Sequence, residues 1–296
     1  MKRQKAKRQK GSYTRIGAVC VLLFALGLGI LLYPTVSSRW NKWRQEQLIA
    51  EYASSVSEME AEGVSLADEW EKAEAYNRSL FPSILPDSFA IAQAQGEPDE
   101  TYMACLNLSG DGVMGYVSIP KINIKLPIYH TTAEEMLQKG VGHLEGSSLP
   151  VGGEGTHAVL AAHRGMPNAE MFTNLDQLEI GDHFLLYILD NVLCYEVDQI
   201  IVVEPADTEA LSVEEGEDLV TLLTCTPYGV NTQRLLVRGH RVEYEEETVQ
   251  AETGTANLIT HTSYSLWAVG GMIVTAALIV VRRLVIKKRG GPQNER

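Results

Sequence analysis

Two long apolar runs stand near the two ends of the chain. Residues 16–33 form 18 consecutive positions without a charged side chain, and residues 266–281 form 16. About 20 such residues cross a bilayer as a helix. The second run extends to residue 286 if the side chains of Arg282 and Arg283 reach back to the interface. We therefore expect transmembrane helices over residues 16–33 and 266–286.

Basic side chains flank both runs on their terminal sides. Residues 1–15 carry seven Lys or Arg and no acid, and residues 282–296 carry six with one acid. The positive-inside rule then places both basic tails, 1–15 and 287–296, in the cytoplasm and residues 34–265 outside the cell. A cleaved signal peptide is the alternative for the first run, but that run is long for one, and small residues for a cleavage site occur only weakly at Thr35 and Ser37.

Residues 16–281, which lie between the two groups of basic side chains, are strongly acidic. The whole chain has 25 basic and 38 acidic side chains and a net charge of −13, whereas residues 16–281 hold 12 basic and 37 acidic side chains, a net charge of −25. A body with this charge repels polyphosphate, which excludes nucleic-acid binding by the folded part of the chain.

The chain outside the expected membrane spans changes character several times. Apolar or small residues recur every three or four positions from Tyr52 to Ala73, which predicts one long extracellular helix over residues 39–80 within the helical segment 34–80, packed on the domain or forming a stalk. Residues 81–112 are interrupted by Pro and Gly and are expected to form a connecting loop, of a length that often serves as a lid. Residues 248–265 are rich in Thr, Ala and Ser and are expected to form a linker to the second span.

Residues 113–247 have the pattern of short strands rich in Val, Ile, Leu and Tyr. One short helix fits residues 133–139, and Asp190-Asn191 suits a hairpin turn. About seven strands with almost no helix predict a mostly β fold, a closed or nearly closed barrel. The expected strands are residues 115–119, 122–129, 157–162, 184–189, 192–203, 219–224 and 234–244.

Cys225 is the cysteine whose position favours chemistry. Cys20 lies in the first apolar run, which leaves an odd number, Cys105, Cys194 and Cys225, on the outer side. An odd count in an oxidising compartment leaves at least one thiol unpaired. Cys194 fits a small buried side chain within its strand. Cys225 ends a strand and precedes Pro227, which cannot continue a β-ladder, so we expect the thiol beside a loop that a substrate can reach.

A catalytic thiol needs a base or a cation nearby and donors for an oxyanion. Among the seven histidines, His163 is the weakly favoured candidate for the base, because it follows an apolar strand just as Cys225 ends one. Arg234 begins the next strand after the Cys225 loop, so antiparallel pairing would return it to Cys225. Arg238 has the same parity but lies about 13 Å further along the strand, which makes it the weaker candidate. HExxH, CxxC, Walker A and GxSxG motifs are absent, which excludes the corresponding chemistries.

At this point the motifs are recognisable. Thr221-Leu-Leu-Thr-Cys225 resembles the TLxTC motif of sortases, and its continuation TPYGVNTQRLLVRGHR resembles the class C branch, which polymerises pilins. Residues 161–182 resemble the stretch around the catalytic histidine of that class, with Ala162 where Gly is more usual, and residues 110–130 resemble the opening strands of its barrel. The resemblance covers about residues 70–245. It implies a sortase-type barrel over residues 113–247.

The resemblance implies a membrane-anchored cysteine transpeptidase of peptidase type on the surface of a Gram-positive bacterium. Cys225 would be the nucleophile, His163 the general acid and base, and Arg234 the group that holds the substrate and its oxyanion. The family cleaves an LPxTG-like sorting signal between Thr and Gly and, in class C, passes the acyl group to a pilin lysine, without a metal or other cofactor. A sortase that anchors surface proteins to a cell-wall precursor amine is the nearest alternative, and a non-catalytic envelope scaffold is the alternative of another class.

Class C sortases commonly cover the site with a lid that carries an Asp-Pro-aromatic triplet. The matching residues here are Asp87, Ser88 and Phe89, so a serine replaces the proline. The resemblance implies that Asp87 pairs with Arg234 and that Phe89 covers Cys225.

Overall fold

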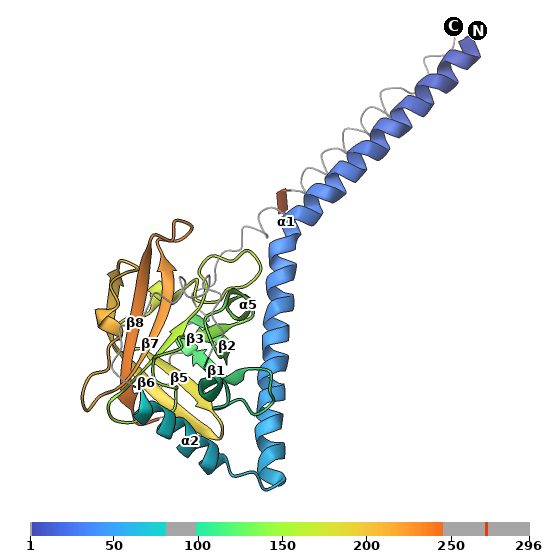
Figure 1. The fold of residues 1–296 in the computed structure, drawn as a ribbon. Coiled ribbons are helices and arrows are strands. Elements are labelled where there is room, and N and C mark those ends of the chain that lie inside the picture. Colours follow the sequence, from blue (N-terminus) through green and yellow to red (C-terminus); the bar gives the residue numbers. More distant parts are fainter. Residues whose placement is uncertain (1, 81–98, 245–269, 272–296) are drawn as a thin grey trace. The chain divides into compact units, whose positions relative to one another are not determined.

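The computed structural model describes residues 2–80, 99–244 and 270–271 (Figure 1). The chain divides into two compact units, one of Met1–Val36 with Ile259–Arg296 and one of Ser37–Leu258. Within the described residues, one helix, Leu22–Ala61 of α1 (Lys2–Ala61), is long and apolar enough to cross a membrane. Its side chains Leu22, Phe24 and Ile30 are exposed. An exposed apolar surface of this kind suits a lipid environment, which supports membrane anchoring.

The single helix predicted over residues 39–80 is wrong in one respect, because the chain breaks there into α1 and α2 (Leu66–Ser79). Gly63 adopts φ +86° after the end of α1. The N–H of Val64 donates to the Met59 carbonyl, and the N–H of Gly63 donates to the Glu60 carbonyl. This pair of bonds is the Schellman motif that closes a helix at a left-handed glycine. Ser65 then caps α2 by accepting from the N–H of Asp68.

Eight strands form a closed barrel in the order β1-β2-β3-β4-β7-β8-β6-β5 (Figure 1). The β2–β3 and β4–β7 pairs are parallel, and the other pairs are antiparallel. The mostly β closed barrel expected from the sequence is therefore confirmed. The strands are β1 (Val113–Ile119), β2 (Ile124–Tyr129), β3 (Val141–His143), β4 (Thr156–Ala161), β5 (His183–Ile188), β6 (Asn191–Val203), β7 (Asp218–Thr226) and β8 (Gln233–Val242).

Five local features differ from the predicted elements. Strand β3 was missed because three residues around a glycine show no alternation. The predicted strand 122–129 starts at residue 124, since a 3₁₀ turn, η1 (Pro120–Ile122), precedes it. The hairpin between β5 and β6 turns at Leu189 and Asp190, one residue earlier than predicted, because Leu189 adopts φ +53°. The helix predicted over 133–139 shortens to α5 (Glu134–Leu137), and α4 (Glu100–Met103) forms in the predicted loop.

Helices α1 and α2 brace one side of the barrel from Ser37 onward. The Tyr52 hydroxyl of α1 donates to the Met114 carbonyl (2.9 Å) and accepts from the N–H of Leu189 (2.8 Å). From α2, the Asn77 amide bonds both backbone groups of Leu149 (2.7 and 3.1 Å).

Candidate active site

Strands β4, β7 and β8 are neighbours in the barrel wall, and their side chains alternate between its two faces. One face joins the main core. The other face packs in a smaller apolar cluster of Leu137, Leu144, Val159, Ala161, Leu211, Leu223 and Leu236. His163, Cys225 and Arg234 each stand two residues along the chain from a member of this cluster. The three candidate residues therefore share the parity of one face of the wall.

The strand register brings these three positions together. The antiparallel ladder of β7 and β8 pairs Cys225 with Arg234. The parallel ladder of β4 and β7 pairs the last residue of β4 with Leu223, and the N–H of Ala162 still donates to the Leu223 carbonyl (3.1 Å). Continuing that register by two residue pairs beyond the end of β4 would align His163 with Cys225. The predicted return of Arg234 to Cys225 is thus present in the fold.

Cys225 is the penultimate residue of β7, so the strand runs two residues beyond its predicted end at 224. The residue is 9% exposed and its thiol forms no disulfide. Next to it, the Thr224 hydroxyl donates to the Ala162 carbonyl (2.7 Å). This buried bond ties the end of β7 to the segment that carries His163.

His163 lies just beyond β4 with a partly exposed ring. Its Nε2 atom lies 3.4 Å from a carboxylate oxygen of Glu134, the first residue of α5. Its carbonyl accepts from the N–H of Phe172 (3.1 Å), which fixes the backbone behind the ring. Glu134 was not singled out from the sequence, because nothing in the spacing of residues 134 and 163 indicates a contact.

Arg234 is also 9% exposed, at the start of β8. Its Nη1 atom donates to the carbonyls of Gln233 (3.2 Å) and Asn231 (3.4 Å). These bonds hold the planar guanidinium at the end of the strand. A fixed guanidinium beside a thiol suits an oxyanion that develops on an attacked carbonyl.

Arg238, the weaker candidate, forms ion pairs with Asp198 and Glu214. Its Nε and Nη2 atoms donate to the two carboxylate oxygens of Asp198 (3.0 Å each), and Nη1 donates to Glu214 (2.6 Å). The hydrogen bonds to Asp198 raise the pKa of Arg238 above its ordinary value. This ion-pair network gives Arg238 a structural role further along the same face.

Arg164 is a site-supporting residue that sequence reasoning missed. Its Nη1 atom donates to the Thr226 hydroxyl (2.9 Å), and its Nη2 atom pairs with Asp176. Since Arg164 follows His163 and Thr226 follows Cys225, the guanidinium bridges the segment after β4 and the end of β7. Its side chain is 7% exposed. The HR dipeptide after a strand was visible in the sequence, but only the fold shows what the arginine contacts.

Three other histidines, His130, His143 and His157, are buried with partners of their own. His157 contacts the Ser212 carbonyl and the Thr221 hydroxyl (2.8 Å each). His143 contacts the Tyr102 hydroxyl (2.9 Å) and the Ser148 carbonyl (2.8 Å). Burial lowers the pKa of all three rings, that of His143 to about 4. Their contacts assign these rings to the structural core.

The remaining sequence predictions concern metals, other thiols and the lid. Among the described residues, no three His, Cys, Asp or Glu side chains gather as a metal site. Cys105 and Cys194 are buried. The lid residues Asp87 and Phe89 lie outside the described residues, so their contacts stay a prediction.

Comparisons with known proteins identify the barrel. A family model described as the sortase domain matches residues 117–242. Sortase A of Bacillus anthracis is 29% identical over 154 residues, which cover 52% of this chain and 71% of the relative. Sortase D of Bacillus subtilis is 33% identical over 131 residues, which cover 43% of this chain and 63% of the relative.

Solved structures give a higher identity over a longer stretch. Sortase C of Streptococcus pneumoniae is 48% identical, with a TM-score of 0.60, and the match covers 67% of this chain and 97% of that one. Sortase C-1 of Actinomyces oris is 46% identical, with a TM-score of 0.56, and the match covers 61% of this chain and 100% of that one. The chain therefore belongs to the sortase family of transpeptidase enzymes, and these structural neighbours are class C sortases.

Proposed function

We propose that this protein is a class C sortase that cleaves an LPxTG-like sorting signal between Thr and Gly and joins the new acyl end to a pilin lysine. The observation that carries the proposal is the pairing of Cys225 with Arg234 across β7 and β8, with His163 two residues beyond the end of the neighbouring strand β4. The similar sortase C of S. pneumoniae adds support, since its structure is described as informative on pilin substrate specificity.

In the first half-reaction, the Cys225 thiolate attacks the carbonyl carbon of the signal's threonine. The tetrahedral intermediate carries its negative charge on the former carbonyl oxygen, where the Arg234 guanidinium stabilises it. His163 donates a proton to the departing glycine nitrogen as the C–N bond breaks. The products are a thioester on Cys225 and a free glycine amine.

In the second half-reaction, a lysine amine attacks the thioester carbon. His163 accepts the proton that the amine loses, and the C–S bond breaks to restore the Cys225 thiolate. The new bond is an isopeptide. Splitting amide exchange in this way replaces one difficult displacement with two easier ones.

The neighbouring contacts support this division of roles. Arg164 and Thr224 each link the chain around His163 to the chain around Cys225. A carboxylate oxygen of Glu134 on α5 lies 3.4 Å from His163 Nε2. Rigid links of this kind matter because a misplacement of about 1 Å at reacting groups can cost about a hundredfold in rate.

The proposal extends to the arrangement of the chain in the membrane. The exposed apolar part of α1 supports one span over residues 16–33. We propose the second span at 266–286, cytoplasmic tails at 1–15 and 287–296, and a lid within 81–112 from the sequence pattern. The catalytic barrel then lies on the outer side of the membrane.

Anchoring of surface proteins to a cell-wall precursor amine is the competing reaction within the family. The identities favour the pilin reaction, since the sortase C structures match at 46% and 48% whereas Sortase A of B. anthracis matches at 29%. A scaffold without activity is disfavoured because the chain retains all three groups, with the thiol and guanidinium residues paired across β7 and β8 and the histidine just beyond β4.

The choice of amine is tested with a fragment of residues 34–265, which contains the compact unit Ser37–Leu258. The fragment is incubated with an LPxTG peptide and either a lysine-containing pilin peptide or an oligoglycine, and ligated products are counted by mass spectrometry. We expect an isopeptide to the lysine peptide in excess over the glycine product, with Cys225→Ala yielding neither. A dominant glycine product would overturn the pilin assignment. Asp87→Ala with Phe89→Ala is run in parallel, and faster turnover is expected if the lid covers the site.

A further inference from the structure

A cluster of basic residues stands immediately after the first apolar run. Residues 38–44, which we call the juxtamembrane segment, contain Arg39, Lys42 and Arg44 and no acid. These are three of the 12 basic residues in a region of net charge −25. The concentration of positive charge at this one place sets it apart from the rest of the acidic body.

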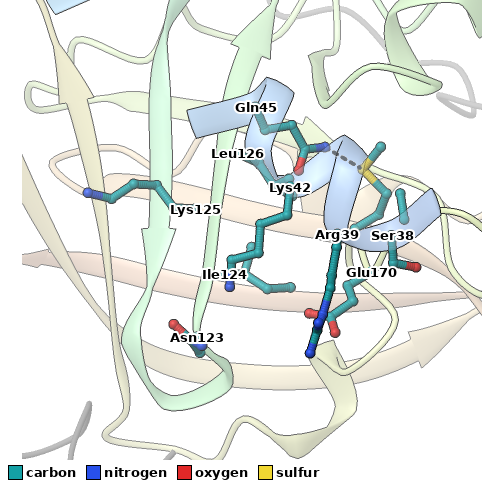
Figure 2. Close-up of a pocket in the computed structure, with 11 residues that line it drawn as sticks. Ser38, Arg39, Lys42, Gln45, Asn123, Ile124, Lys125, Leu126 and Glu170 are labelled. Atoms are coloured by element: carbon teal, nitrogen blue, oxygen red, sulfur yellow. Dashed lines mark hydrogen bonds between the residues drawn. The ribbon is translucent and has the colours of Figure 1, made fainter. Parts of the chain in front are cut away.

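Two of these cations line a cavity within the Ser37–Leu258 unit. The cavity has a volume of about 100 Å³, which holds several water molecules but no folded segment. Arg39, Lys42 and Lys125 line it together with one carboxylate, that of Glu170. Figure 2 shows Lys42 directed toward Asn123 and Ile124, Arg39 directed toward Glu170, and Lys125 directed away from them. The cavity thus has a net positive lining.

The residues at the floor of the cavity are buried and hydrogen-bonded, whereas Arg39 and Lys42 form no ion pair with the described residues. The floor residues Leu126, Ala169 and Met171 are buried, and the Gln45 amide donates to the Lys139 carbonyl (3.2 Å) and to the Met171 sulfur (3.8 Å). Within the described part of the chain, neither Arg39 nor Lys42 has a carboxylate oxygen within 4.0 Å. Two cations over a preformed floor suit a small anion such as a phosphate group.

The same segment carries two exposed tryptophans. Trp40 and Trp43 are 60% and 50% exposed, and their ring centroids lie 5.2 Å apart. Large exposed rings cost free energy in water, and tryptophan is enriched where a protein crosses the membrane–water interface. The aromatic pair therefore indicates that this segment lies at the lipid headgroups.

The chain length also keeps the cavity close to the bilayer. Arg39 is six residues beyond Tyr33, the last residue of the apolar run. Six residues span at most about 20 Å, whatever their conformation. The headgroup layer is therefore within reach of the cavity if residues 16–33 span the membrane.

We propose that the cavity beneath Arg39 and Lys42 binds the phosphate of an anionic phospholipid in the outer leaflet, with Trp40 and Trp43 at the interface. Bound lipid would fix the start of the extracellular domain at the membrane surface. The proposal rests on the membrane span of the proposed function and not on its chemistry, so lipid binding and acyl transfer can fail separately.

The test uses the full chain in detergent, titrated with phosphatidylglycerol or phosphatidylcholine and followed by native mass spectrometry. Wild type is expected to prefer phosphatidylglycerol, and Arg39→Gln with Lys42→Gln is expected to weaken its binding about tenfold or more. The matched control, Lys7→Gln with Arg8→Gln, removes the same charges from the basic tail and is expected to change binding less. Equal losses in the two double variants, or no preference in wild type, would overturn the proposal.

A variant that is expected to strengthen lipid binding distinguishes a real site from misfolding, because a misfolded protein would bind lipid less well. Glu170→Gln removes the one carboxylate of the cavity and is expected to tighten phosphatidylglycerol binding. Unchanged or weaker binding in that variant would count against the site. Glycerol phosphate, added as a competitor, distinguishes a free anion from a lipid. We expect little displacement by it, whereas full displacement at equal concentration would assign the cavity to soluble phosphates instead.

Discussion

Cys225 on β7 and Arg234 on β8 are directly paired across an antiparallel ladder. Side chains of such a pair point to the same face of the sheet, with their Cβ atoms about 5 Å apart. The loop between the two strands can therefore vary without separating thiol and guanidinium. The ladder fixes the relationship that the proposed chemistry needs.

Replacement of Arg234 by lysine should therefore remove activity while keeping the charge. The lysine ammonium lacks the planar set of donors of the guanidinium, and loss of one oxyanion donor costs about 10²–10³-fold in rate. The measurement is the rate of LPxTG peptide cleavage by the 34–265 fragment. Arg238→Lys is the matched control on the same strand and face, and it should keep most of the rate. Comparable losses in both variants would remove the special role of Arg234.

Thr224→Val should lower both stability and rate. The valine keeps the shape of the side chain but removes the 2.7 Å hydrogen bond to the Ala162 carbonyl. Leaving a buried acceptor without its donor costs about 1–3 kcal/mol in the free energy of unfolding. Urea unfolding of the fragment measures this loss, and Thr224→Ser, which retains the hydroxyl, should recover most of it. A valine variant as stable as wild type would show that the bond does not tie the two strand ends together.

Glu134→Gln should have a small effect that depends on salt. The carboxylate lies 3.4 Å from His163 but is 57% exposed. A pair this exposed is strongly screened, so we expect less than about a fivefold loss in cleavage rate at low salt and a smaller difference at high salt. Glu135→Gln, at the adjacent position, pairs with Lys139 instead and serves as control. A hundredfold loss in Glu134→Gln would mean that the carboxylate takes a direct part in catalysis.

His143 should make the fold sensitive to acid. Burial lowers the pKa of His143 from 6.5 to about 4, so the folded ring is neutral where the unfolded ring already binds a proton. Its contribution to stability is complete above pH 6.5 and is lost as the pH falls toward 4, by about 3 kcal/mol in total. Urea unfolding between pH 7 and 4 measures how steeply the free energy of unfolding falls with pH. His143→Gln should flatten it in part, because burial also lowers the pKa of His130 and His157. If the pH dependence of stability in His143→Gln is unchanged and matches that of the control His240→Gln, whose side chain is 40% exposed, this assignment is contradicted.

The sequence pattern was sufficient for those parts of the fold that depend on alternation and spacing. Strands of six or more residues were predicted to within two residues at most of their ends, and the parity of residues 225 and 234 followed from strand geometry. Strand β3 was not predictable in this way, since its three residues are held by neighbours distant in the sequence. The helix break at Gly63 was not predicted either, because the apolar spacing continues across it and its left-handed conformation is evident only in the structure.

Some residues of the candidate site could likewise be predicted from the sequence, and others could not. His163 and Cys225 were singled out because each stands at the end of an apolar strand, whereas the parallel pairing of those two strands is seen only in the structure. Glu134 and Arg164 contribute through contacts that join separate loops, and no local pattern indicates such contacts. The burial of His130 and His143 likewise depends on the closed barrel and its covering helices, which no single segment reveals.

The most direct test of the proposed chemistry is mass spectrometry of the 34–265 fragment after incubation with an LPxTG peptide. A covalent adduct with the mass of the acyl half of the peptide is expected on Cys225 and should be absent from Cys225→Ala. Deletion of residues 82–92 should increase the yield if the lid restricts access. If both the intact and the lidless fragments remain unmodified by LPxTG and its sequence variants, Cys225 is not the nucleophile of a transpeptidase.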